Sequence, residues 1–312
     1  MIVPFDYKSI AIGADFITRN SELNALTNLL SNNENIAIYG IKGCGKSSLI
    51  RNLFLNIQKT SLNLKVCEID MVNIRRPEQF QKALLEQVIE NGGVVDTSDG
   101  ADPYMEPERL AQATSSKVVV YLKEFQSVLN FDDPYTFLKE YENVCRERKN
   151  VCYIFSGSKV NAMKHIFEEK KYFYNLYENV PLLPLNKKLT TDYIIRVFLK
   201  VGRVIDKDFT EYIYDLCESN PFYMWQIASN AFNMTKGYVT KEIVEDSINF
   251  VLSTQSGYFR TLVDSLSNFQ LSLLRAVFNG ETKFGTQEVI MRYKLNTSAN
   301  VHRLKEALKK KE

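Results

Sequence analysis

The sequence predicts an α/β protein in which a parallel sheet core is followed by a helical lid and a C-terminal helix-turn-helix or winged-helix-like module. Apolar runs of strand length alternate with amphipathic helical segments between residues 36 and 167, which is the pattern of a parallel sheet. Beyond residue 186 the apolar periodicity is helical throughout. We therefore expect a core over 1–185, a lid over 186–255 and a small module over 256–312.

Composition restricts the class of protein. The chain has 312 residues, 45% of them hydrophobic and 24% charged, with a net charge of +2. Its five cysteines are odd in number and form no C-x-x-C pair, which argues against a disulfide framework and a zinc site. No apolar run has the length of a membrane span, and the first residues lack the features of a signal peptide. These observations predict a cytoplasmic protein with no membrane partner.

A glycine-rich turn joins an apolar strand at 36–39 to a helix at 46–58 and reads G-x-x-x-x-G-K-S. This spacing is the phosphate-binding loop of P-loop NTPases. The glycines let backbone N–H groups point at phosphate oxygens, the lysine reaches the β- and γ-phosphates, and the serine hydroxyl is placed to ligate Mg²⁺. The sequence thus predicts ATP and Mg²⁺ as ligands, with Ser47 at the metal, and nucleotide contacts from Gly40, Ile41, Lys42, Gly43, Cys44, Gly45, Lys46, Ser47 and Ser48.

Segments on either side of this loop supply further candidates. Leu23, Leu26 and Leu30 mark an amphipathic helix just before the first strand, and Arg19 precedes it. Arg19 is expected either to contact nucleotide or to form a surface salt bridge. After the loop we expect a strand over 64–70 and a helix over 77–90. Asp70 ends that strand, where it would approach Mg²⁺ or water, or else cap a helix or lie at the surface.

Residues 92–107 are rich in Gly, Pro and Asp and predict a mobile acidic surface loop with little core. The next strand, 117–126, is a continuous apolar run that ends in Lys123 and Glu124. P-loop ATPases carry an Asp and then a Glu at this place. Glu124 fits the water-activating role, and Lys123 stands where the Asp is expected.

Two serines lie at the end of the following strand, which we expect over 151–158 after a helix at 134–147. Either Ser156 or Ser158 is placed to sense the γ-phosphate, although Ser158 is equally suited to cap a helix over 159–167. An edge strand at 181–185 is expected to end the core.

Helices are predicted downstream. The lid is expected at 190–201, 208–218, 222–233 and 240–252, and the C-terminal module at 268–279, 285–293 and 297–310. The last helix directs Val301, Leu304 and Leu308 inward, and its basic residues lie largely elsewhere. This arrangement resembles a DNA-reading helix without the β-hairpin wing, and the alternative is a solvated basic end on a small packing module. The candidate DNA contacts are Arg303, Lys305, Lys309 and Lys310.

Taken together, these motifs resemble the archaeal-type ATPases of the STAND branch related to AAA+ proteins, whose plan is similar to that of archaeal origin-recognition initiators. The similarity rests on Arg19, the phosphate loop, the strand end Glu124-Phe125-Gln126 and the Gly157-Ser158 strand end. It implies that Lys46 binds phosphate, Ser47 the metal, that Glu124 polarises water and that Ser158 or Ser156 senses the γ-phosphate. The family's Asp-Glu-Phe-Gln is Lys-Glu-Phe-Gln here, so weak hydrolysis is expected.

The leading interpretation is an ATP-dependent switch of the AAA+/STAND type, which couples nucleotide state to the binding of DNA or a protein partner. Two alternatives remain: a nucleotide-binding scaffold without turnover, and a DNA-handling ATPase of the initiator or transposition-helper kind. The expected partners are ATP or ADP, DNA at the C-terminal module, and another protein or further copies of this chain.

Overall fold

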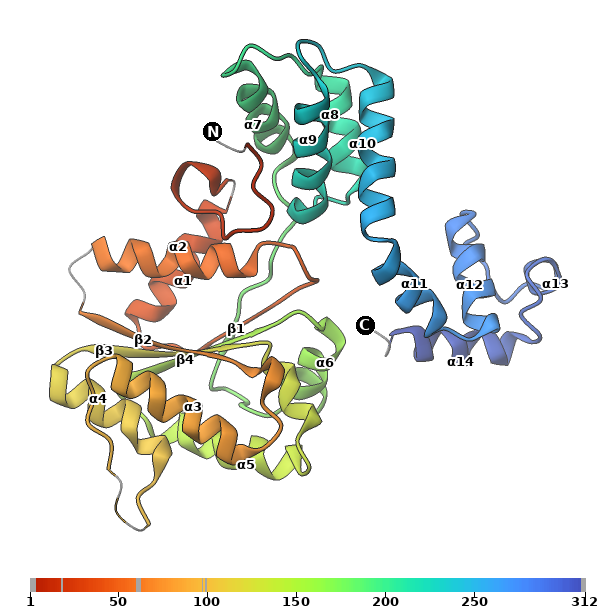
Figure 1. The fold of residues 1–312 in the computed structure, drawn as a ribbon. Coiled ribbons are helices and arrows are strands. Elements are labelled where there is room, and N and C mark those ends of the chain that lie inside the picture. Colours follow the sequence, from red (N-terminus) through yellow and green to blue (C-terminus); the bar gives the residue numbers. More distant parts are fainter. Residues whose placement is uncertain (1–3, 18, 60–62, 97, 99, 310–312) are drawn as a thin grey trace. The chain divides into compact units, whose positions relative to one another are not determined.

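The computed structural model describes residues 4–17, 19–59, 63–96, 98 and 100–309 (Figure 1). The chain divides into two compact units, the first ending at Val244 and the second beginning at Glu245. Among the described residues no helix is both long and apolar enough to span a bilayer.

A five-stranded parallel sheet forms the centre of the first unit. Its order is β2-β3-β4-β1-β5, with every neighbouring pair parallel. The α/β class with a parallel sheet is therefore confirmed. The strands are β1 Ile36–Tyr39, β2 Leu64–Asp70, β3 Lys117–Lys123, β4 Val151–Gly157 and β5 Glu178–Asn179.

Helices cover both faces of this sheet, as Figure 1 shows, and each face has its own core. Along β3, Val118, Val120 and Leu122 pack on one side, and Val119 and Tyr121 pack on the other. This alternation explains why the strand is a continuous apolar run, since successive side chains point to opposite faces. One face carries α1 Asn20–Ser31 and α2 Lys46–Lys59, and the other α3 Pro77–Glu90, α4 Glu106–Thr114, α5 Pro134–Glu147 and α6 Val160–Lys164.

Four helices follow the sheet in the region where the sequence predicts a lid, and they are here called the lid helices. They are α7 Lys187–Leu199, α8 Lys207–Leu216, α9 Pro221–Met234 and α10 Lys241–Thr254, the last of which crosses into the second unit. Asn186 and Asn220 cap α7 and α9 through their side-chain oxygens.

Residues 4–16, here called the N-terminal segment, tie the lid to the core. Phe5 is buried, and its ring lies 5.6 Å from that of Phe198 and 6.0 Å from that of Trp225, both in lid helices. Further along, Asn52 of α2 accepts a hydrogen bond from Gly13 N and donates one to Ala11 O. These contacts were not predicted, because the sequence of this segment offers no periodic pattern.

The second unit is helical over its described residues, 245–309, and contains no strand there. After the end of α10 come α11 Ser256–Asp264, α12 Asn268–Phe278, α13 Gln287–Arg292 and α14 Ser298–Lys309. Its core consists of Leu273, Ala276, Val289, Leu295, Val301 and Leu304. The inward positions predicted for Val301 and Leu304 are confirmed.

Two local predictions were wrong, and two hold in part. The edge strand expected at 181–185 is absent, because pairing to β1 stops at Val180 and Pro181 has no N–H to continue it. The strand expected to reach 126 ends at Lys123, because Glu124 turns the chain with φ 52°. The helix expected over 159–167 is present, as α6 followed by a π-helix at His165–Glu169.

The fourth concerns residues 92–107, which were expected to carry little core. None of the described residues from 92 to 105 is buried, as expected, but Glu106 and Pro107, the first residues of α4, are. The proline explains the error, because Pro is favoured in the first turn of a helix as well as in loops. Helix α11 was not predicted at all.

Candidate functional site

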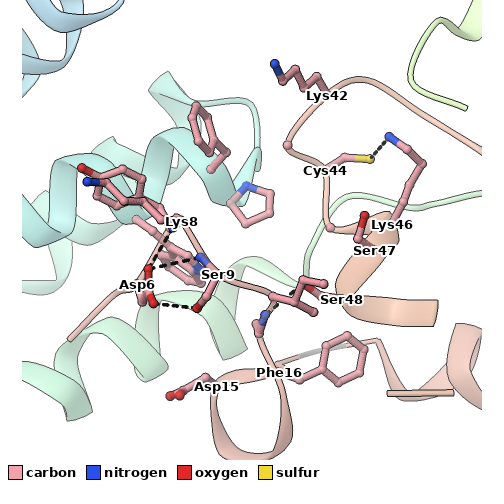
Figure 2. A pocket seen from close by; sticks show the side chains of 18 of the residues that line it. Asp6, Lys8, Ser9, Asp15, Phe16, Lys42, Cys44, Lys46, Ser47 and Ser48 are labelled. Atoms are coloured by element: carbon pink, nitrogen blue, oxygen red, sulfur yellow. Dashed lines mark hydrogen bonds between the residues drawn. The ribbon is translucent and has the colours of Figure 1, made fainter. Parts of the chain in front are cut away.

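A cavity of about 350 Å³ lies in the first unit, over the turn between β1 and α2. Three parts of the chain enclose it: the phosphate loop, the N-terminal segment and the first turn of α9 (Figure 2). Its lining includes Arg19, Glu124, Ser158 and the loop residues 42–48. These predicted residues thus meet at one place, whereas Gly40 and Ile41 of the same loop are not among the described lining residues.

Two loop glycines have a backbone conformation that other residues rarely adopt. Gly43 has φ +83° and Gly45 has φ +95°. Gly40 donates from its backbone to Gly157 O at 3.2 Å, which joins the start of the loop to the end of β4. These constraints explain why the turn needs glycine at these positions.

Lys46 is 8% exposed, and its ammonium donates to two carbonyls of its own loop. Its Nζ lies 2.6 Å from Gly40 O, 3.1 Å from Ile41 O and 3.6 Å from Cys44 Sγ. Figure 2 shows the ammonium beside the Cys44 sulfur. An ammonium so placed can exchange these carbonyls for phosphate oxygens, which are stronger acceptors because they are charged.

The two serines after Lys46 differ in their surroundings. Ser47 is exposed and lines the cavity. Ser48 accepts a hydrogen bond from Ala11 N at 3.1 Å, so its hydroxyl holds the N-terminal segment against α2.

The buried Arg19 side chain contacts the phosphate loop. It is 4% exposed, so the surface salt bridge considered for it is wrong: its ion pair with Glu22, at 2.9 Å, is buried. The guanidinium also donates to Cys44 O at 2.9 Å and to Leu183 O at 3.0 Å. It thereby joins α1, the phosphate loop and the segment that leads to the lid.

Glu124 reaches the cavity from the end of β3, in a left-handed conformation. Its Oε2 accepts from Ser158 Oγ at 2.5 Å, from Ser158 N at 3.2 Å and from Gln126 Nε2 at 2.6 Å. The structure therefore joins the two residues that were expected to act on water and on the γ-phosphate. Ser156, the other candidate sensor, is buried against Tyr121 OH and Leu122 O and is absent from the described lining of the cavity.

Lys123 points to the neighbouring strand. Its Nζ lies 3.3 Å from Glu68 Oε1 and 3.7 Å from Asp70 Oδ2. None of these three residues is among the described residues that line the cavity. Asp70 also accepts from Val72 N at 3.0 Å, which is the capping role that the sequence left open for it.

The lid contacts the phosphate loop directly. Asn220 donates from Nδ2 to Lys42 O at 3.1 Å, while its Oδ1 caps α9. A Cβ atom added to Gly43 would lie 2.7 Å from Phe222 Cβ and 2.9 Å from Asn220 Oδ1. The first turn of α9 and the phosphate loop therefore lie in close contact.

The donor set fits Mg²⁺ held mainly by phosphate. The described residues contain no group of three or more His, Cys, Asp or Glu side chains that would form a metal cage. In nucleotide sites Mg²⁺ needs only one or two protein oxygens, because phosphates and waters complete its octahedron. The exposed Ser47 hydroxyl, at the start of α2, fits that requirement.

The basic residues of α14 form a separate candidate site. Arg303, Lys305 and Lys309 are exposed, while Lys310 lies outside the described residues. Lys305 lies over the ring of Phe284 at 4.4 Å, and Lys309 pairs with Glu306 at 2.9 Å. Surface contacts of this strength do not prevent the side chains from meeting phosphate.

Comparison with known proteins places these features in context. Residues 16–227 match the ATPase domain described as predominantly from Archaea. No curated protein sequence matches the chain.

Three solved structures share the fold at low sequence identity. A Walker-type ATPase of Pyrococcus abyssi aligns with TM-score 0.74 and 17% identity, covering 98% of this chain and 93% of that one. The Aeropyrum pernix ORC2 protein, solved as ADPNP-ADP complexes, gives TM-score 0.67 and 16% identity, with 98% and 89% covered. The Aeropyrum pernix ORC1 protein in complex with DNA gives 0.55 and 16%, with 97% and 85% covered.

Proposed function

Because the chain belongs to this predominantly archaeal ATPase domain family, we propose that it is an ATP-binding molecular switch of the AAA+/STAND type. In this proposal nucleotide occupies the cavity over the phosphate loop, and its state biases the binding of DNA or a protein partner. A ligand shifts a conformational equilibrium only through different contacts with the two states. The lid must therefore respond to what the loop holds.

The contact between Gly43 and the first turn of α9 carries this proposal. The loop that would hold the phosphates leaves no space for even a methyl group between itself and Phe222. Any rearrangement of loop carbonyls around phosphate also changes Lys42 O, which Asn220 holds. The core and the lid helices therefore contact each other at the place where the nucleotide would bind.

The proposal gives each residue of the site a role. Lys46 would bind the phosphates, and Ser47 would supply an oxygen to Mg²⁺, which would neutralise phosphate charge. Glu124 would orient water, with Ser158 holding its carboxylate until the γ-phosphate competes for the hydroxyl. Because Lys123 stands where a metal-associated Asp is expected, hydrolysis is proposed to be weak.

Titration calorimetry with ATP and ADP tests the site. Lys46→Ala should abolish ATP binding, because it removes the ammonium that the loop spacing assigns to the β- and γ-phosphates and that lies on Gly40 O and Ile41 O. Lys59→Ala, at the exposed end of α2, is the control and should bind as the natural protein does. Unchanged affinity in the Lys46 variant would falsify the assignment.

Phosphate release separates a switch that turns over from an inactive scaffold. Brisk release by the natural protein would exclude the scaffold, and release that appears only in Lys123→Asp would favour it. Lys123→Met is the matched control, because it removes the ammonium from Glu68 and Asp70 without adding a carboxylate.

A DNA-handling ATPase is the second candidate, favoured by the exposed cations of α14. DNA affinity should fall steeply as salt rises, because phosphate contacts release counterions. Replacing Arg303, Lys305 and Lys309 by Gln should abolish binding, whereas replacing the exposed Lys82, Lys139 and Lys149 of the first unit should not. Salt-independent binding would contradict this candidate.

A further inference from the structure

The second unit contains a groove of about 960 Å³ that the proposed nucleotide chemistry does not use. It lies between α11, α12 and the end of α13. All of its lining residues fall between positions 263 and 294, so it belongs to the second unit alone. The apolar part of the lining consists of Val263, Leu266, Leu271, Leu274, Val277 and Phe278, with Tyr293 beside them.

Helix α12 has two apolar faces, and only one is needed for the core. Leu273 and Ala276, three residues apart, are buried in the core of the unit. Leu274, Val277 and Phe278 share the spacing i, i+3, i+4 and are exposed, Phe278 by 92%. A helix that only packs on its own unit has a polar outer face. The outer face of α12 is therefore available for another apolar surface.

Helix α11 extends this surface. None of its residues is buried, although its sequence is strongly amphipathic. Leu262 and Val263 are both exposed, and Val263 belongs to the groove lining. Contiguous exposed apolar surface of this kind is typical of a protein interaction site.

The charged residues that line the groove are all basic. Its lining contains Arg275, Arg292 and Lys294 and no carboxylate. Arg292 is already paired with Glu281 at 2.7 Å and Glu288 at 2.6 Å. Arg275 and Lys294 are exposed and form no ion pair with any residue that the structure describes.

We propose that this groove binds an acidic amphipathic helix of a partner protein. The apolar stripe of such a helix would cover Leu274, Val277 and Phe278, and its carboxylates would meet Arg275 and Lys294. Amphipathic helices bind grooves in this way through apolar residues at i, i+3, i+4 and i+7. DNA does not fit, because a phosphate backbone gains nothing from an exposed Phe and Val surface.

Fluorescence anisotropy with the full chain tests the proposal. The probe is a labelled helical peptide with Leu at i, i+3, i+4 and i+7 and Glu at flanking positions. One control peptide has the same composition without the stripe, and a second carries Lys in place of Glu. The acidic striped peptide should bind at least tenfold more tightly than either.

Substitutions locate the binding. Phe278→Asp and Arg275→Glu should each weaken the acidic peptide at least tenfold, and both alter exposed side chains, so folding should survive. Lys283→Glu is the matched control, because it reverses an exposed charge of the same unit that does not line the groove. Arg275→Glu should also gain affinity for the Lys peptide.

Three results would overturn the proposal: absence of binding, equal binding of all three peptides, and binding indifferent to Phe278→Asp. Light scattering distinguishes another occupant. If the natural protein is a dimer that Phe278→Asp dissociates, the groove is occupied by a second copy of this chain, and the proposed partner is wrong.

Discussion

Replacing Gly43 by Ala tests whether the lid rests on the phosphate loop. The new methyl group would lie 2.7 Å from Phe222 Cβ and 2.9 Å from Asn220 Oδ1, which is closer than such atoms approach. The backbone there has φ +83°, so the substitution also forces a left-handed conformation on a residue with a side chain. Two costs are therefore combined at one position.

The magnitude follows from these two parts. A left-handed conformation costs a residue with a Cβ about 1–2 kcal/mol. Displacing the first turn of α9 loses the hydrogen bond from Asn220 to Lys42 O, worth about 1 kcal/mol. We expect Gly43→Ala to lower the free energy of unfolding by about 2–3 kcal/mol and to weaken ATP binding about fivefold.

Gly202→Ala is the matched control. Gly202 also has a left-handed backbone, with φ +72°, but a Cβ atom added there meets nothing within 4 Å. Its unfolding free energy should fall by about 1–2 kcal/mol, from the backbone alone, and its ATP affinity should not change. Urea unfolding and calorimetry on both variants give the comparison.

The difference between the variants is the informative quantity. If Gly43→Ala and Gly202→Ala lose the same stability and both retain full ATP affinity, the lid does not press on the loop. The argument that joins lid position to nucleotide would then be wrong.

Three further predictions concern stability. Arg19→Ala should lower the free energy of unfolding by about 3–5 kcal/mol, because it leaves the buried Glu22 carboxylate without a cation; adding Glu22→Gln should restore part of the loss in urea unfolding. Phe5→Ala should cost about 3–5 kcal/mol, since its ring packs among lid aromatics, and an unchanged urea midpoint would contradict the anchoring of the N-terminal segment. Burial raises the pKa of Cys67 to about 12 and that of Cys152 to about 11. In the unfolded chain these thiols therefore lose their protons first, near the ordinary pKa of about 8.5. The free energy of unfolding is unaffected below that pH and falls as the pH rises toward 11, by about 1.4 kcal/mol per pH unit for each thiol. Burial also raises the pKa of Cys145 and that of Cys217, so four thiols contribute to the slope. Urea midpoints from about pH 8.5 to 9.5 measure it, and Cys67→Ala should reduce it by about a quarter.

The sheet core was predictable because its signals are local. The strand at 64–70 and the helices at 77–90 and 134–147 have the expected bounds. Each combines an apolar period with a clear start, such as Pro77 or Pro134 in the first helical turn. The phosphate loop was equally predictable, since its spacing follows from the geometry of phosphate binding.

The rest of the site depends on contacts between residues distant in the sequence. Arg19 contacts Cys44 and Leu183, and Phe5 packs on lid helices more than 180 positions away. The periodic spacing of apolar residues within one segment does not indicate such long-range contacts. The direction of Lys123 could not be predicted either, because it depends on pairing Asp70 beside Lys123 in the register of β2 and β3.

The backbone conformation at Glu124 is unfavourable for a residue with a side chain. Its φ of 52° lies in the left-handed region, which glycine adopts readily and glutamate does not. Glu124→Gly should relieve about 1 kcal/mol of backbone strain. It also removes the acceptor of three hydrogen bonds, from Ser158 Oγ, Ser158 N and Gln126 Nε2, so the net free energy of unfolding should fall in urea titration. The left-handed turn ends β3 and still places the carboxylate of Glu124 in the cavity, where Ser158 and Gln126 hold it.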